Sequence, residues 1–193
     1  MTDPPLRSIS IDVGEVLQRS VTSLYASLVT RPTGRAVRMA IETQLQDVAT
    51  ISLSLIDFSE VVILDFSCAD EVVAKLLQQY LHDEARDAYF LFRGVLEPHR
   101  DQIEVVLARQ GLAAVIESDP GQFALIGVAT DGEAKAWNFI EQRGTLEPEA
   151  VDAAFASPEE RASLTSLLAR GLVFRSRESG RLHALSRLIE HLA

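Results

Sequence analysis

Short apolar segments typical of strands alternate with segments of helical periodicity over the first two thirds of this chain. The strand-like segments are residues 8–17, 51–58, 88–93, 113–117 and 123–128. Between them, apolar side chains recur every three or four positions around 37–48 and 69–81, and a further helix opens at Glu97 and Pro98 and ends at Gly111. Strands that alternate with crossover helices favour parallel pairing. The pattern therefore predicts an α/β fold with a mixed or parallel sheet covered by helices.

The pattern changes after residue 130, where helical segments follow one another directly. Trp137 and Ile140 mark a first helix, and residues 146–155 mark a second. The third has a strong start signal, because Ser157-Pro158-Glu159-Glu160 is a capping box with proline just inside the helix. Segments 173–175 and 181–185 then flank a glycine-containing loop, which is typical of a hairpin. We therefore divide the chain into two domains, residues 1–130 and 131–193.

Charge and composition exclude several classes of protein. The 193 residues carry a net charge of −10, which disfavours non-specific attraction to nucleic acid or anionic lipid. No run of eighteen apolar residues exists, so we expect no membrane span. The amino-terminal residues lack the basic and apolar regions of a secretion signal. Together these features predict a soluble, cytoplasmic protein.

One stretch in the first domain resembles a family signature. Residues Ile56-Asp57-Phe58-Ser59-Glu60-Val61-Val62-Ile63-Leu64-Asp65-Phe66-Ser67 resemble the motif of STAS domains, the fold of anti-sigma factor antagonists. The Arg-containing segment 34–42 and the run Ser67-Cys68-Ala69-Asp70-Glu71 are similar to the STAS-like branch of that family. The chain departs from the broader family at Glu60, Phe66, Cys68 and Asp70. The resemblance implies a STAS-like domain over about residues 8–128.

The resemblance also implies a site around Ser67. This serine occupies the position that resembles the phosphorylated serine of the family, at the start of a helix. A phosphate there would sit beside Asp65, Asp70 and Glu71, and like charges would expel a partner protein. The partner that the resemblance implies is a GHKL-type ATPase or an anti-sigma-type kinase. The alternative is that Ser67 only caps the helix, supported by Asp70 three residues later.

Signals for an enzyme, a cofactor or a metal are weak. Cys68 is the only cysteine and has no histidine near it in the sequence, which favours a small buried residue over an activated thiol. The four histidines lack metal-ligand spacing, so we expect them to be surface or packing residues. Residues 30–35 lack the spacing of a phosphate-binding loop, and we interpret 30–34 as a turn. We therefore expect no enzymatic activity, no cofactor and no metal site.

The carboxyl-terminal domain resembles bacterial winged-helix domains, chiefly over residues 164–185. Its third helix offers Arg161, Thr165, Ser166 and Arg170 for contacts to bases, and its hairpin offers Arg175, Arg177 and Arg181 for contacts to phosphates. Six arginines and one acidic residue lie within 161–187, which favours DNA binding. Glu159 and Glu160 oppose it, because they lie at the helix end that usually enters the major groove.

These observations predict a regulatory protein. The first domain is expected to dock or sense a partner protein, and the winged helix to bind DNA in transcriptional regulation. In the alternative, the protein is an adaptor whose winged helix mediates homodimerisation or docking to another protein.

Overall fold

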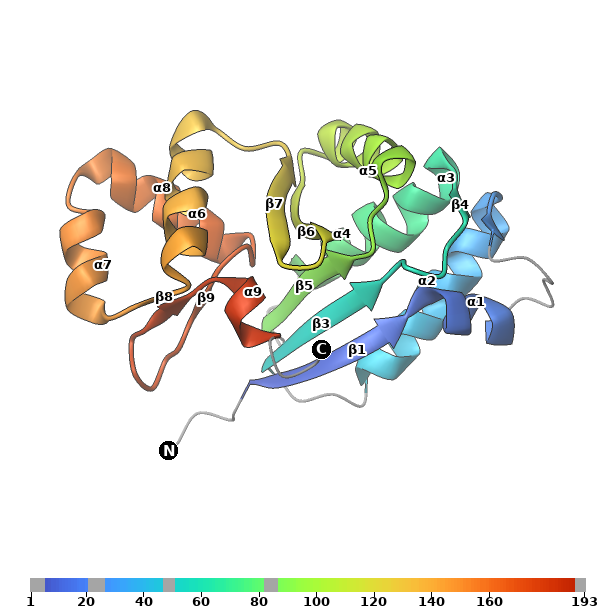
Figure 1. Cartoon of the computed structure of the whole chain (residues 1–193), viewed down its shortest axis with the longest axis horizontal. Coiled ribbons are helices and arrows are strands. Elements are labelled where there is room, and N and C mark those ends of the chain that lie inside the picture. Colours follow the sequence, from blue (N-terminus) through green and yellow to red (C-terminus); the bar gives the residue numbers. More distant parts are fainter. Residues whose placement is uncertain (1–5, 21–26, 47–50, 82–86, 190–193) are drawn as a thin grey trace.

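A five-stranded mixed sheet forms the centre of the protein (Figure 1). The computed structural model describes residues 6–20, 27–46, 51–81 and 87–189. The sheet order is β1 (Arg7–Asp12), β3 (Ile51–Asp57), β5 (Asp87–Arg93), β6 (Ala113–Asp119) and β7 (Gln122–Gly127). The first four strands are parallel and β7 is antiparallel to β6. The predicted α/β class with a mixed sheet is confirmed.

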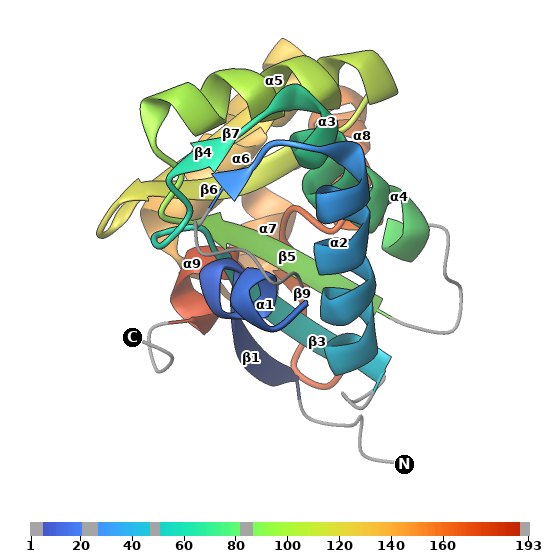
Figure 2. The same ribbon diagram turned by 90° about the vertical axis from the view of Figure 1, so that its right-hand side faces the viewer.

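One face of the sheet is covered by helices from the first part of the chain, as Figure 2 shows. They are α1 (Val13–Ser20), α2 (Arg31–Gln46), α3 (Phe66–Ala69), the π-helical segment η1 (Asp70–Lys75), α4 (Leu76–Leu81) and α5 (Glu97–Gln110). Two short strands, β2 (Ser27–Leu28) and β4 (Ile63–Leu64), pair in parallel beside them. As predicted, α5 opens with Pro98 in its first turn and ends at Gly111, whose φ of 67° suits glycine.

Helices and a small sheet from the last part of the chain form a second layer. The elements are α6 (Asp131–Arg143), β8 (Thr145–Leu146), α7 (Pro148–Ala154), α8 (Pro158–Ala169), β9 (Phe174–Arg175), β10 (Leu182–His183) and α9 (Leu185–Leu188). The small sheet is antiparallel with the order β8-β10-β9, so the predicted hairpin is confirmed. The predicted capping box is also present, since Ser157 and Glu160 bond to each other's backbone N–H groups.

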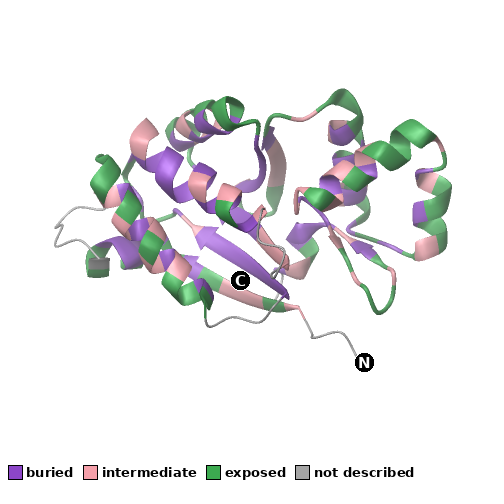
Figure 3. Cartoon of the chain, turned by 180° about the vertical axis from the view of Figure 1, so that it is seen from behind, coloured by how far each residue is buried: buried purple, intermediate pink, exposed green. Residues whose placement is uncertain are grey.

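The two halves of the chain share a hydrophobic core. Leu53, Leu55, Leu91 and Val115 alternate along the central strands and point to one face of the sheet, where they pack with Trp137 and other apolar residues of 131–193. The opposite face packs against α1 to α5. The central strands are therefore buried on both sides, as Figure 3 shows. The predicted boundary falls in the loop between β7 and α6, and the division into separate domains stays a prediction.

Three predicted elements differ from the structure. The strand predicted over 8–17 ends at Asp12, because Val13, Val16 and Leu17 are buried at helical spacing and Asp12 accepts the Glu15 N–H at 3.0 Å, which caps α1. The turn predicted over 30–34 is the start of α2, which begins at Arg31 and places a proline in its first turn. The helix predicted over 146–155 begins at Pro148, because Leu146 belongs to β8.

Candidate functional site

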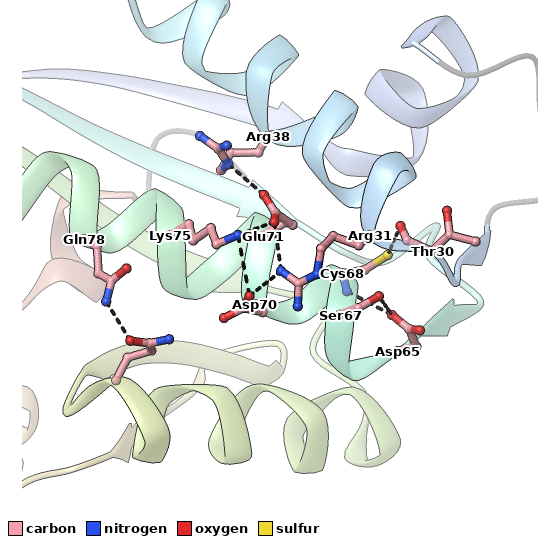
Figure 4. Close-up of polar contacts among 11 residues, drawn as sticks. Thr30, Arg31, Arg38, Asp65, Ser67, Cys68, Asp70, Glu71, Lys75 and Gln78 are labelled. Atoms are coloured by element: carbon pink, nitrogen blue, oxygen red, sulfur yellow. Dashed lines mark hydrogen bonds and ion pairs between the residues drawn. The ribbon is translucent and has the colours of Figure 1, made fainter.

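One candidate site lies where β4 leads into α3. We call it the Ser67 corner and define it as Val62, Ile63, Asp65 and Ser67. Asp65 caps this helix, because one of its carboxylate oxygens accepts hydrogen bonds from the Cys68 N–H and from the Ser67 hydroxyl, both at 2.9 Å (Figure 4). The prediction that Ser67 is the helix cap is therefore wrong. Asp65 takes that role because it has the extended backbone of an N-cap residue, while Ser67 already lies inside the helix.

Cys68 is a buried packing residue, as predicted. Its thiol donates to the Thr30 carbonyl oxygen at 3.0 Å, and its side chain is fully buried. Burial and the neighbouring Asp65 carboxylate raise the pKa of the Cys68 thiol to about 12. The thiol therefore stays protonated at neutral pH, which removes the nucleophilic form.

Asp70 and Glu71 lie in an ion-pair network with α2. Arg31 contacts Asp70 at 2.6 Å and Glu71 at 2.9 Å, Arg38 contacts Glu71 at 3.3 Å, and Lys75 pairs with Glu71 (Figure 4). Glu71 is 2% exposed. Burial raises the pKa of its carboxyl, but hydrogen bonds from Lys75, Arg31 and Arg38 outweigh burial, and the net effect lowers it.

This network changes the electrostatics expected around Ser67. The negative charges of Asp70 and Glu71 are balanced by the cations of Arg31, Arg38 and Lys75. Asp65 is the acidic residue that contacts the Ser67 hydroxyl directly. Of the four residues predicted for a site around Ser67, the structure thus joins Ser67 to Asp65 and joins Asp70 and Glu71 to α2. Sequence reasoning missed the arginine partners, although their spacing of seven residues places both on one face of a helix.

Apolar side chains are exposed beside Ser67. Val62, just before β4, and Ile63, its first residue, are 69% and 50% exposed. Asp65 continues the same segment and donates its N–H to the Leu28 carbonyl oxygen at 2.8 Å. The segment that leads to Ser67 therefore presents two exposed apolar side chains, and Ser67 itself is partly exposed.

The residues predicted for base contacts on α8 are mostly engaged within the protein. Ser166 donates to the Glu133 carboxylate, and Arg170 contacts that carboxylate at 3.1 Å and the Val128 carbonyl oxygen at 2.6 Å. The Thr165 hydroxyl donates to the Arg161 carbonyl oxygen at 2.8 Å, while both side chains remain on the exposed face. Among the residues predicted for base contacts on α8, Arg161 is therefore the charged one that is exposed to solvent.

The hairpin arginines differ among themselves. Arg177 pairs with Asp87 of β5 at 2.6 Å, and Arg181 pairs with Glu147 at 3.0 Å. Both pairs are exposed, so each stabilises the fold only weakly. Arg175 is exposed on β9. Acidic partners thus neutralise two of the three arginines expected to contact phosphates.

An apolar groove of about 410 Å³ lies between α6, α7 and α8. Phe139, Ala154 and Phe155 line it, and Lys135, Glu159 and Glu160 border it. The two phenylalanine rings meet edge to face with centroids 6.1 Å apart. The amino-terminal end of α8 therefore presents an apolar and acidic surface. Sequence reasoning identified the glutamates and missed the groove, which forms only when three helices pack together.

Histidines and acidic residues form no metal site within the described residues. His99 is buried against the Val62 carbonyl oxygen, and His183 lies 3.0 Å from the Thr145 hydroxyl. His82 and His191 lie outside the described residues. None of the described helices has the length and apolar character needed to cross a membrane.

Comparisons with known proteins return no relative. No protein-family model, curated protein or solved structure matches the chain.

Proposed function

We propose that this chain is a non-enzymatic regulatory adaptor that docks other proteins, with a STAS-like α/β domain followed by a winged helix. Residues 131–193 contain, in order, a helix (α6), a strand (β8), two helices (α7 and α8) and a hairpin (β9 and β10). This order, together with the small sheet β8-β10-β9, supports the winged helix. The parallel strands with crossover helices, and the Asp65-to-Glu71 segment at the start of α3, support the STAS-like domain.

The observation that carries this proposal is the apolar groove at the amino-terminal end of α8. In a DNA-binding winged helix this end enters the major groove and faces phosphates. Here it presents Phe139 and Phe155 together with Glu159 and Glu160. These two carboxylates outnumber Lys135, the one cation of the lining, so the groove repels phosphates and suits an apolar protein segment that carries basic side chains. Docking of a protein therefore fits this surface better than docking of DNA.

The Ser67 corner provides the second docking surface. The exposed Val62 and Ile63 offer apolar contacts, and the partly exposed Ser67, which follows them in the chain, donates its hydroxyl to Asp65. A phosphate on Ser67 would add negative charge next to Asp65 and weaken docking. The partner class implied by the STAS resemblance is a GHKL-type ATPase or an anti-sigma-type kinase.

Capture of partners by the full chain tests the role of the groove. Proteins retained from native extract are compared between the wild type, Glu159→Lys at the groove and Glu149→Lys as a matched control. Both glutamates are exposed in the first turn of a helix, and Glu149 does not line the groove. We expect a defined protein to be lost with Glu159→Lys and retained with Glu149→Lys. Equal retention by both variants would contradict the proposal.

DNA binding is the second candidate function, and the exposed Arg161 on α8 and Arg175 on β9 favour it. If it operates, the full chain shifts mixed genomic fragments at low salt. Replacing both arginines with alanine then lowers the slope of log affinity against log salt concentration by about two, because about two fewer counterions are released on binding. If the full chain shifts no DNA fragment at low salt, DNA binding is rejected and protein docking remains the proposed function.

A further inference from the structure

The outward face of α2 carries a stripe of apolar side chains. Pro32, Ala36 and Met39 follow one another at spacings of four and three residues, so they share one face of the helix. The opposite face holds Val37 and Ile41, which are buried in the core. Met39 is 53% exposed, Pro32 is exposed and Ala36 is partly exposed. Apolar residues at these spacings are the anchors with which an amphipathic helix enters an apolar groove.

Basic side chains run along one edge of this stripe. Beside it lies a hollow of about 580 Å³ between α2 and η1, and the cations that line this hollow are Arg31, Arg35, Arg38 and Lys75. Carboxylates of α2 and η1 pair with three of the four. Arg35 is exposed and has no ion pair within the part of the chain that the structure describes. The surface therefore offers an unpaired guanidinium one helical turn before Met39.

The groove between α6, α7 and α8 complements this surface. Phe139 and Phe155 give it an aromatic lining, and aromatic rings make favourable contacts with the sulfur of methionine. Two carboxylates and one cation border it. Glu160 already accepts the Ser157 N–H at 2.9 Å, whereas the exposed Glu159 carboxylate has no partner among the described residues. An apolar helix face with an adjacent arginine thus matches the groove in both shape and charge.

The two surfaces cannot meet within one copy of the chain. Figure 1 shows α2 towards one end of the long axis and α6, α7 and α8 at the other end. The buried residues of α2 belong to the core on one face of the sheet, and those of α6, α7 and α8 belong to the core on the other face. Contact between stripe and groove therefore requires two copies, each of which contributes a different surface.

We propose that the groove binds α2 of a second copy of this chain, so that copies associate head to tail. This inference rests on the proposed docking function of the groove and names its partner. Met39 of one copy contacts the rings of Phe139 and Phe155 in the next, and Arg35 pairs with Glu159. A docked pair leaves one groove and one stripe unused, to which further copies can add. Because one helix face in one groove is a small interface, the association is weak and increases with protein concentration.

Sedimentation velocity of the full chain, from about 10 μM to about 1 mM, tests the proposal. We expect the average mass of the wild type to rise with concentration. Met39→Glu on the stripe and Glu159→Lys at the groove should each weaken self-association by about tenfold or more. Gln44→Glu, exposed on α2 outside the stripe, and Glu149→Lys, exposed outside the groove, are the controls with the same changes of charge. Both controls should associate as the wild type does.

An equimolar mixture of the two interface variants separates docking from misfolding. Met39→Glu keeps an intact groove, and Glu159→Lys keeps an intact stripe. Each variant alone should remain monomeric, whereas the mixture should form a dimer and no larger species. A variant that had lost its fold could not restore association in this way.

Three results would overturn the inference. The first is a wild type that stays monomeric at every concentration. The second is association of the wild type that the mixture of variants does not restore. The third is an equal loss of association in the interface variants and their controls. If Glu159→Lys still loses a defined protein from native extract, the groove docks a different protein, and the proposed function stands although this inference fails. If that variant loses no protein either, both fail.

Discussion

Arg177 in the loop between β9 and β10 donates to Asp87 at the first residue of β5, at 2.6 Å and across 90 positions of sequence. Next to this pair, the rings of Tyr89 and Phe174 meet edge to face with centroids 5.3 Å apart. The hairpin is therefore joined to the central sheet by a polar and an aromatic contact. These contacts border the apolar cluster that the two segments share.

Residues 131–193 are expected to be required for the stability of the first segment. A fragment of residues 1–130 would expose Leu53, Leu55, Leu91 and Val115, each at most 1% exposed in the full chain. We expect this fragment to bind a hydrophobic dye and to scatter light at concentrations where the full chain does neither. A monomeric fragment with a sharp thermal transition and no dye binding would show instead that residues 1–130 are an independent domain.

Acid should weaken the attachment of α8 to α6 through Glu133. Burial raises the pKa of this carboxyl, but hydrogen bonds from Ser166 and Thr130 and the charge of Arg170 outweigh burial and lower it to about 2. Because this pKa is lowered in the folded state, the ionised carboxylate stabilises the fold at pH values above its ordinary pKa of about 4.5. This stabilisation is lost as the pH falls from about 4.5 towards 2.

We therefore expect urea unfolding to show a loss on the order of 2 kcal/mol from this group between neutral pH and about pH 3. Glu133→Gln should show a smaller decrease over the same range, and Glu178→Gln should behave as the wild type does. The same decrease in all three proteins would assign the acid sensitivity to other carboxylates.

The helix cap at the Ser67 corner predicts unequal costs for two alanine variants. Asp65→Ala removes the acceptor of the Cys68 N–H, so we expect it to lower the free energy of unfolding by about 1 kcal/mol. Ser67→Ala removes a side-chain hydrogen bond at a partly exposed position and should cost less. Chemical denaturation of both variants measures the difference, and a larger loss for Ser67→Ala would contradict the assignment of the cap.

Much of the fold follows from local sequence patterns. The buried strand 51–57 carries apolar side chains at four of its seven positions, and the boundaries of α5 and α8 are marked by Pro98, Gly111 and the Ser157 capping box. The segment 8–17 misled because Val13, the first residue of the helix, continues the alternation of Ile9 and Ile11 in the strand. The buried set Val13, Val16 and Leu17 separates them, but only once burial is known.

The candidate sites were less accessible to sequence reasoning. Ser67 and Glu159 were found because each lies in a helix-start motif. The partners of Arg31, Arg170 and Arg177 lie 37 to 90 positions away, so no local pattern reveals that these arginines are neutralised. The groove between α6, α7 and α8 also depends on packing, because its lining comes from three helices. The stripe on α2 has one local signal, which is the helical spacing of its apolar residues.

Two arginines predicted to contact DNA should differ sharply when each is replaced with alanine. Arg170 is 21% exposed and binds both Glu133 and the Val128 carbonyl oxygen, so its removal leaves a nearly buried carboxylate without its cation. We expect Arg170→Ala to lower the free energy of unfolding by about 1.5–3 kcal/mol. Arg177 is 66% exposed and pairs with a carboxylate that is 40% exposed, so Arg177→Ala should cost less than about 1 kcal/mol. Urea denaturation at moderate salt compares the two variants with the wild type. Equal small losses would show that Arg170 is not needed for packing and would return it to the set of residues available to a partner.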